Sequence, residues 1–371
     1  MEPFKTLLSA QTVEHLADHV FRVCPNARRG QFVPELVTRI APLEMKDRAR
    51  AMADALREVL PTDPGPRAEA LKAMLHPDTD GAGTCDDDGL RGWAVWPLTM
   101  LVATDGLEDF DRSMALLRDM TMRFTSEFAV RAFLLADTRR ALAIMSRWVD
   151  DPNPHVRRLV TEGTRPRLPW GERLPMFVKD PLPILPLLDA LRDDPSEYVR
   201  RSVANSLNDI AKDHPAVVTR IAGRWMDDAS EARAKLVRHA LRSLIKAGNP
   251  EALQVLGMSA PVLEAGVPVL TADRIALGQT LEVTCTLASR SDGPQKLGVD
   301  VVIWFLKADG SRRPKVFKGS VITLSAAQSL IFRKSVPLRA VTTRRHYTGA
   351  HQVALRINGR DTGLTDFWLE A

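Results

Sequence analysis

The spacing of apolar residues changes once along the chain. Up to about Leu256 these residues recur at intervals of three and four, as in amphipathic helices, with stops such as Gly248-Asn249-Pro250 between the runs. Beyond Pro261, short runs rich in Val, Thr and Phe alternate with polar residues between Gly and Asp turns, as in β-strands. We therefore predict an all-α domain over residues 1–257 and an all-β domain over residues 258–371.

The β domain is predicted to be an immunoglobulin-like sandwich, because seven short strands fit within its length. Trp304 in a central strand is consistent with that fold. Cys285 has no second cysteine to pair with, so we expect a sandwich without the disulfide of many such domains. The predicted strands cover residues 260–270, 280–289, 300–308, 315–324, 328–336, 349–357 and 365–370.

A motif repeats within the helical part. Asp150-Asp151-Pro152, followed by His155-Val-Arg-Arg158, returns 43 residues later as Asp193-Asp194-Pro195, followed by Tyr198-Val-Arg-Arg201. A weaker third copy begins at Asp227. HEAT-like repeats of paired helices have a period of roughly 40 to 47 residues. We therefore predict a HEAT-like solenoid whose second helices line one concave wall.

In each copy, the acidic pair ends a first helix and the basic residues open a second one. The first helices are predicted over residues 141–149, 184–191 and 217–226, and Ser196 and Ser230 are the predicted N-caps of second helices. The second helix over 196–213 has an apolar face and a polar face. The polar face carries Arg201, Asn205, Asn208, Asp209 and Lys212.

A carboxylate with a cationic neighbour one helical turn away occurs three times, as Glu127 with Arg131, Glu162 with Arg158, and Asp209 with Lys212. Taken singly, such pairs are usually local ion pairs on a solvated surface. Repeats, however, stack equivalent residues along one groove. We therefore predict that Glu127, Glu162 and Asp209 converge among a row of arginines.

The segment Thr164-Arg-Pro-Arg-Leu-Pro-Trp170 directly follows the helix that carries Glu162. Its two prolines stiffen a loop that presents Arg165, Arg167 and an indole. An aromatic ring that stacks on bases or sugars is a frequent partner of arginine in grooves that bind nucleic acids. Tryptophan is, on the other hand, more often a core residue, so both interpretations of Trp170 stay open.

Composition excludes several classes of protein. The 371 residues are 45% hydrophobic and 26% charged, which excludes a disordered or collagen-like chain. The sequence has no phosphate-binding Gly-rich loop, no Gly-x-Ser-x-Gly elbow and no His-Glu-x-x-His, and its His and Cys residues do not cluster. We expect no metal and no cofactor. Three scattered cysteines, no secretory signal and no long apolar run favour a cytoplasmic protein without a membrane partner.

Three segments resemble one family. They are Gly92-Trp93-Ala-Val-Trp96-Pro97, the stretch from Val156 to Trp170, and the stretch from Ser196 to Pro215. They are similar, in the same order, to the AlkC family of bacterial DNA alkylation-repair glycosylases, most strongly from about Gly92 to Gly257. The resemblance implies a HEAT-like solenoid that removes cationic N3-methyladenine-type bases from duplex DNA in base excision repair.

Carried over to matching positions, the resemblance implies Glu127, Glu162 and Asp209 as catalytic carboxylates, with Trp170 beside the lesion. It also implies catalysis without flipping the lesion out of the stack, unlike most glycosylases. Only one branch of the family has a C-terminal immunoglobulin-like domain. We expect a monomer whose partner is duplex DNA containing alkylated bases.

The expected DNA contacts extend beyond the carboxylates. In the helical part, Asn205 is a second candidate substrate contact beside Trp170. The candidate phosphate contacts there are Arg158, Arg165, Arg167, Arg201, Lys212 and Arg238. After residue 257 the chain has 15 Lys+Arg against 9 Asp+Glu, which accounts for its whole net charge of +5. Two predicted basic loops, with Arg312, Arg313 and Lys315 in one and Arg344 and Arg345 in the other, predict an additional DNA contact.

The main alternative is a HEAT-repeat scaffold without enzymatic activity, or a damage-binding protein that uses the same groove. The repeat architecture alone would favour a scaffold. The carboxylates and the matching segments favour the enzyme. A catalytically inactive relative is expected to lose a carboxylate, and all three are present.

Overall fold

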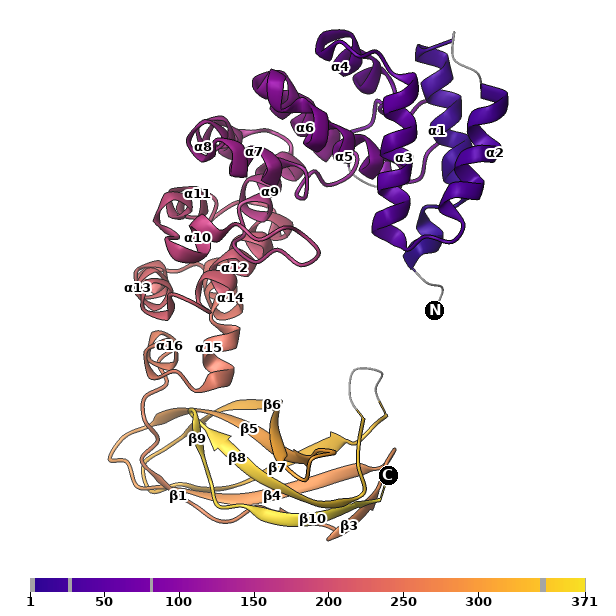
Figure 1. Ribbon diagram of the computed structural model, residues 1–371. Helices are drawn as coiled ribbons and strands as arrows, with labels where there is room; N and C mark the ends of the chain where they lie inside the picture. The colour runs from indigo at the N-terminus through magenta and orange to yellow at the C-terminus, as the bar shows by residue number, and fades with distance from the viewer. Residues whose placement is uncertain (1–3, 26–28, 81–82, 341–344, 371) are drawn as a thin grey trace. The chain divides into compact units, whose positions relative to one another are not determined.

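The computed structural model describes residues 4–25, 29–80, 83–340 and 345–370. The chain changes from helices to strands between α16 (Pro250–Val255) and β1 (Leu263–Ala265), as Figure 1 shows. The predicted fold class, a helical-repeat domain followed by a β-sandwich, is confirmed. Among the helices that the structure describes, none combines the length and apolarity that a membrane span requires.

Contacts divide the chain into two compact units. The first unit comprises Met1–Asp213 with Ser230–Ala240, and the second comprises His214–Ala229 with Leu241–Ala371. The predicted domain boundary at residue 257 stays a prediction, since the second unit groups three helices with the strands.

The first unit is built from helices that stack pairwise. The second helices of three successive pairs are α9, α12 and α14. Helix α12 lies between the other two and packs against both. The α-helices of this unit are α1 (Ala10–Val23), α2 (Arg29–Ile40), α3 (Met45–Val59), α4 (Pro64–Ala73), α5 (Trp96–Asp105), α6 (Phe110–Thr121), α7 (Val130–Ala136), α8 (Thr138–Met145), α9 (Pro154–Gly163), α10 (Pro175–Lys179), α11 (Leu185–Ala190), α12 (Glu197–Ile210) and α14 (Glu231–Ala240). Short 3-10 helices lie between some of them, at Gly92–Val95, Gly106–Asp109, Ser146–Asp150 and Leu182–Ile184, and η1 (Phe4–Leu7) begins the described chain.

The repeated motif has a structural basis in the turn before each second helix. Asp151 and Asp194 each accept a hydrogen bond from the backbone N–H two residues later, at 2.9 and 2.8 Å. The first arginine of each motif, Arg157 or Arg200, donates to two carbonyls of its own turn. Arg157 also binds Asp194 of the next copy through two nitrogens, at 2.6 and 3.0 Å. The repeated residues therefore hold one repeat to the next.

The two predicted N-caps have different outcomes. Ser230 caps α14, because its Oγ accepts a hydrogen bond from the Arg233 N–H at 3.2 Å, which confirms that prediction. Ser196 occupies the N-cap position of α12, but its side chain makes no capping hydrogen bond. The predicted cap position is therefore confirmed without its side-chain hydrogen bond, and Asp194 accepts the Ser196 N–H in the same turn.

The second unit contains α13 (Pro215–Met226), α15 (Arg242–Ala247), α16 and two β-sheets. In one sheet β4 pairs with β1, β2 and β7; the other sheet has the order β3-β10-β8-β5-β6, with β9 paired to β8. Buried side chains that alternate along β4, β5 and β8 fill the space between the sheets. The remaining strands are β2 (Val269–Leu270), β3 (Arg274–Ala276), β4 (Thr280–Ser289), β5 (Gln295–Leu306), β6 (Arg312–Leu324), β7 (Ser329–Pro337), β8 (Gly349–Ile357), β9 (Arg360–Asp361) and β10 (Thr365–Glu370).

The strand prediction needs several corrections. Strand β5 begins at Gln295, five residues before its predicted start, and β3 and β9 were not predicted. The run predicted over 260–270 is two strands, β1 and β2, separated by Gly266 and Pro268. Strand β6 begins at Arg312, three residues before the predicted start, because the turn at Gly310 closes tightly through a 2.8 Å hydrogen bond from Lys307 N–H to the Ser311 carbonyl. Pairing with β5 therefore starts at once, opposite Leu306.

The last helices of the second unit pack directly on its sheets. A Cβ atom added at Gly248, after α15, would lie 2.6 Å from Cα of Gly359, in the turn between β8 and β9. Both glycines have positive φ. Arg356 on β8 donates to the Lys246 carbonyl at 3.1 Å. The close approach of two backbones explains why glycine occupies both positions.

Candidate active site

Three of the buried carboxylates in the first unit come from three different segments. Glu127 lies in the turn before α7, Glu162 in the last turn of α9, and Asp209 in the last turn of α12. Even the most exposed of the three residues, Glu127, is only 8% exposed. Carboxylates that are buried this deeply require cationic or hydrogen-bonding partners.

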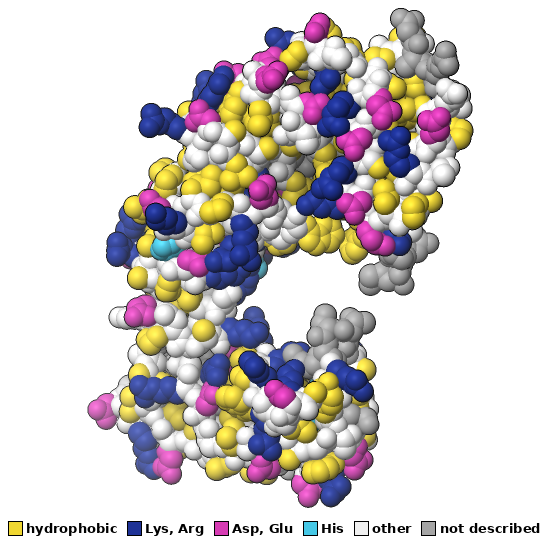
Figure 2. Space-filling view, in the orientation of Figure 1, with side chains coloured by type: hydrophobic (Ala, Val, Ile, Leu, Met, Phe, Trp, Pro, Cys, Tyr) yellow, Lys and Arg dark blue, Asp and Glu magenta, His cyan; other side chains and the backbone are white. Residues whose placement is uncertain are grey.

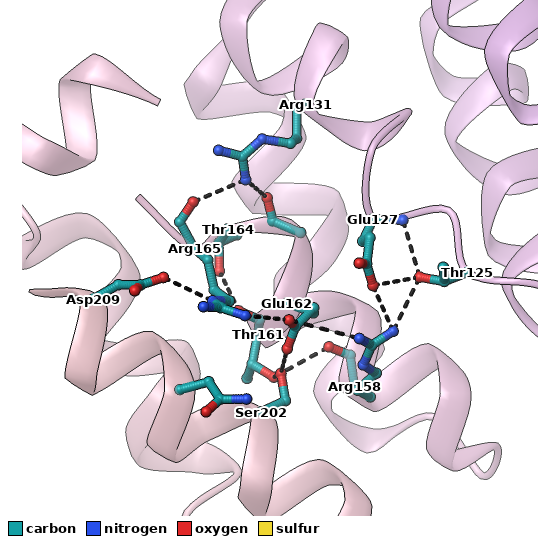
Figure 3. A network of polar contacts seen from close by, with 12 residues as sticks. Thr125, Glu127, Arg131, Arg158, Thr161, Glu162, Thr164, Arg165, Ser202 and Asp209 are labelled. Carbon is teal, nitrogen blue, oxygen red and sulfur yellow. Dashed lines mark hydrogen bonds and ion pairs between the residues drawn. The ribbon is translucent and has the colours of Figure 1, made fainter. Parts of the chain in front are cut away.

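Arginines join the carboxylates into one row, shown in Figure 3. Arg158 lies 2.6 Å from Glu127 and 3.6 Å from Glu162. Arg165 continues the row, at 2.5 Å from Glu162 and 2.8 Å from Asp209. The structure therefore brings together the carboxylates that the sequence singled out, in alternation with positive charges. We refer to Glu127, Arg158, Glu162, Arg165 and Asp209 as the charge row.

Lys212 extends the charge row at its Asp209 end. Its Nζ lies 2.9 Å from Asp209 Oδ1, which confirms the predicted spacing of one helical turn. The pairing predicted between Glu127 and Arg131 is wrong. Helix α7 begins only at Val130, so Glu127 lies outside it and the geometry of a helical turn does not apply. Arg131 instead donates to backbone carbonyls, at 2.5, 2.8 and 2.9 Å.

Hydroxyl groups that were not predicted from the sequence hold two of the carboxylates in place. Thr125 Oγ1 donates to Glu127 Oε2 at 2.7 Å and accepts from Arg158 at 3.0 Å. Ser202 Oγ donates to Glu162 Oε2 at 2.6 Å, and Thr161 Oγ1 donates to Ser202 at 2.6 Å. The one available signal was a serine on α12 among buried apolar positions, directly before Val203.

The charge row keeps its arginines protonated. Burial acts to lower the pKa of Arg158, but Glu127 and Glu162 outweigh it, so that the pKa is raised. The pKa of Arg165 is likewise raised by Glu162 and Asp209 against the effect of its burial. Each carboxylate of the charge row forms an ion pair with at least one arginine. The site therefore offers fixed negative charges in a cationic frame.

The loop after α9 presents an exposed indole. Trp170 is 62% exposed, so a core position for this residue is excluded. Its φ of 64° lies in the left-handed region, which is rare for a bulky residue. Its ring contacts that of Phe4 edge to face, with centroids 6.0 Å apart. On the same loop, Arg167 binds Asp213 through two nitrogens, at 2.8 and 2.9 Å.

The other candidate contacts of the helical part lie outside the charge row. Arg201 is exposed on α12, 3.3 Å from Glu197. Asn205 Oδ1 lies 3.1 Å from His239 Nε2. Arg238 is exposed on α14. Their predicted roles in DNA binding stay predictions.

A residue that the sequence analysis did not select lies beside the charge row. Tyr198, at the start of α12, has Arg158 5.3 Å from its ring centroid and His155 packed edge to face at 5.4 Å. Its side chain is partly exposed, and burial of the hydroxyl raises its pKa. The signal was its place in the repeated motif, where the preceding copy has His155.

The basic segments of the β domain differ from the two predicted loops. Arg312, Arg313 and Lys315 belong to strand β6, which among the described strands pairs with β5 alone and so forms the edge of its sheet. Arg345 lies 5.4 Å from the ring of Tyr347, and Arg344 lies outside the described residues. Figure 2 shows Lys and Arg side chains over the visible face of this domain, with Asp and Glu between them.

One group of side chains in the described residues has the spacing of metal ligands. His76, Asp86 and Asp88 offer ligand atoms within 4.8 Å of one another. His76 Nδ1, however, accepts the Asp78 N–H at 3.0 Å, and its Nε2 lies 3.2 Å from Asp86 Oδ1. Both ring nitrogens are therefore engaged, and this histidine holds its loop together.

Stacked helix pairs that bury a charge row, followed by a β-sandwich, define a class: HEAT-like repeat proteins with a C-terminal immunoglobulin-like domain. Similarity to known proteins shows which family within this class the chain resembles. A family model described as "Uncharacterised protein YhaZ, C-terminal Ig-like domain" matches residues 265–371. The YhaZ protein of Bacillus subtilis (strain 168) is 33% identical over 379 residues, covering 99% of each chain.

The similarity extends to a solved structure over its full length. Pseudomonas fluorescens alkylpurine DNA glycosylase AlkC, bound to DNA containing an abasic site analog, is 36% identical, with 100% of each chain covered and a TM-score of 0.88. The chain therefore belongs to the AlkC family of alkylpurine DNA glycosylases.

Proposed function

We propose that this protein is a DNA glycosylase that hydrolyses the N-glycosidic bond of cationic N-alkylated bases, of the 3-methyladenine type, in duplex DNA. The observation that carries the proposal is the convergence of Glu127, Glu162 and Asp209 in one charge row. The activity and the bound DNA of the Pseudomonas relative support it.

The proposed reaction requires negative charge near the sugar, and it does not require a general acid to protonate the leaving base. A base alkylated on a ring nitrogen is already cationic, so it can leave with the electron pair of the C–N bond without being protonated. The sugar then develops oxocarbenium character, which nearby carboxylates stabilise. Water adds to the anomeric carbon, and a carboxylate takes its proton. Glu127, Glu162 and Asp209 are the candidates for both tasks.

The arginines explain how an acidic site can bind DNA. Isolated carboxylates would repel the phosphate backbone, whereas Arg158, Arg165 and Lys212 balance the three carboxylates charge for charge. Phosphates beside the lesion compete for the same guanidinium groups, which leaves more carboxylate charge directed at the sugar. The exposed Trp170 can add cation–π attraction to the lesion. The exposed position of Trp170 fits a lesion that stays in the base stack. We propose that the protein acts as a monomer.

Release of free base from methylated duplex DNA by the purified protein tests the proposal. We expect 3-methyladenine-type bases in the released fraction, and none from a matched duplex containing uracil, because a neutral base requires protonation to leave. Tight binding of methylated duplex without release of base would instead identify a damage-binding protein. Equal release of uracil would contradict the predicted preference for cationic bases.

A further inference from the structure

Arg131 is a buried guanidinium that binds three carbonyls of one loop. The residue is 1% exposed. Its Nε donates to the carbonyl of Glu172 at 2.5 Å, and its Nη1 donates to those of Gly163 and Arg165 at 2.9 and 2.8 Å. Figure 3 shows it directed at the chain that leads into Arg165. Gly163 ends α9 and Glu172 follows Trp170 by two residues, so the two ends of the loop meet on a single side chain.

This arrangement is costly for the fold. Burial disfavours the charged form of a side chain, and burial together with the nearby Arg165 lowers the pKa of Arg131 to about 10. Its Nη2 finds no hydrogen-bond partner among the described residues. Part of the cost is offset at the end of α9, where a cation interacts favourably with the free carbonyls and the helix dipole.

The loop that Arg131 holds carries two features of the site. Arg165 bridges Glu162 and Asp209 in the charge row. Trp170 is exposed with its backbone in the left-handed region, a strained conformation that persists only where the surroundings impose it. Arg131 holds the loop on both sides of the indole, through the Arg165 carbonyl before it and the Glu172 carbonyl after it.

We propose that Arg131 is a positioning residue of the active site, which fixes the Arg165 guanidinium against the carboxylates and the Trp170 indole beside the lesion. This inference rests on the proposed function. A single guanidinium couples the two features because one planar fork reaches all three carbonyls. A displacement of about 1 Å at a reacting centre can slow catalysis about 100-fold, so loss of this fork acts on the chemical step.

The test compares Arg131→Ala and Arg131→Lys with the wild type in single-turnover base release at saturating protein. We expect both variants to be slowed about 100-fold, with a smaller change in duplex affinity. Lysine keeps the charge but cannot span three carbonyls, so it serves as the better-folded variant. Trp170 fluorescence, taken as the difference from Trp170→Phe in each background, should change its emission maximum.

Chemical rescue separates positioning from simple stabilisation. Millimolar guanidinium chloride should restore base release in Arg131→Ala by occupying the vacated site, whereas methylammonium chloride at equal ionic strength should not. Arg67→Ala is the matched control, since Arg67 is a partly buried arginine of α4 that also binds a backbone carbonyl, at 2.7 Å, away from the charge row. It should lower Tm and leave the rate per folded molecule unchanged.

The proposal is overturned if both Arg131 variants release base at the wild-type rate once the folded fraction is taken into account. It is also overturned if guanidinium raises Tm without restoring the rate. If the wild type itself releases no base, the proposed function fails, and the Trp170 emission and its response to guanidinium still decide whether Arg131 positions the loop.

Discussion

The three carboxylates of the charge row differ in the donors that surround them. Glu162 lies in the middle and meets two arginines and Ser202, whereas Asp209 shares Arg165 and adds Lys212. Breaking a buried ion pair on one side leaves an uncompensated charge. Substitutions that keep the shape of the side chain therefore separate catalysis from folding better than alanine does.

Glu162→Gln and Asp209→Asn should each slow single-turnover base release by roughly 10-fold or more, about 1.4 kcal/mol of transition-state stabilisation. Each change removes negative charge and keeps side-chain volume. Duplex affinity should hold or increase, because the groove becomes more positive. Rates of base release equal to the wild type in both variants, measured on methylated duplex, would remove these residues from the mechanism.

Arg158 and Arg201 occupy equivalent positions in two copies of the motif but have different surroundings. Arg158→Ala should lower Tm and slow base release, since it leaves Glu127 and Glu162 without their shared partner, at a cost of about 3–5 kcal/mol for a fully buried pair. Arg201→Ala should leave Tm unchanged and lower the salt dependence of duplex binding by about 1. Thermal melts and binding titrations at several salt concentrations distinguish the two. An unchanged salt dependence for Arg201→Ala would exclude a phosphate contact.

At the scale of elements, the sequence predicted the helices better than it predicted their contacts. The spacing of apolar residues is a local property, so it located α12 to within a few residues at each end. Contacts depend on where a helix begins. Because α7 starts at Val130, Arg131 points to a distant loop and not to Glu127. The hydrogen bond from the Ser202 hydroxyl could not be predicted either, because its partner Glu162 comes from a different repeat.

Phe4, on the 3-10 helix η1, packs edge to face against the ring of Trp170. We expect Phe4→Ala to shift the emission of Trp170 to longer wavelength, because the indole loses the ring packed against it. Leu7→Ala is the control, as Leu7 is also exposed on η1. The measurement is the fluorescence difference between each variant and the same variant carrying Trp170→Phe. The same shift in both would show that the effect comes from η1 as a whole.

At the scale of the molecule, counting residues predicts the net positive charge of residues 258–371, but it does not predict which strands and turns carry that charge. Two of its basic residues, Arg312 and Arg313, were expected in a loop and instead extend an edge strand, since a turn of few residues let pairing begin early. Edge strands often carry charged side chains that discourage pairing with other chains. A solvated edge is therefore the alternative to a DNA contact.

Replacing Arg312 and Arg313 together by alanine should weaken duplex binding and lower its salt dependence by about 2 if both contact phosphates. The matched control replaces Arg333 and Lys334, an adjacent basic pair on β7 in the other sheet. Equal effects of the two double variants would indicate a response to net charge alone. Titrations of undamaged duplex at several salt concentrations provide the measurement.

The contact between Gly248 and Gly359 determines which part of this protein can be exchanged as a module. Consider a chimaera that takes only residues 258–371 from another family member. Its β8–β9 turn would come from that relative and would pack against α15 of this protein. At this contact a single added methyl group collides with backbone atoms. Exchange from residue 241 onward transfers both glycines and the bond from Arg356 to Lys246 together, while α13 of the same unit, which packs against α16, stays resident. Chimaeras joined before α15 should therefore fold where those joined after α16 do not.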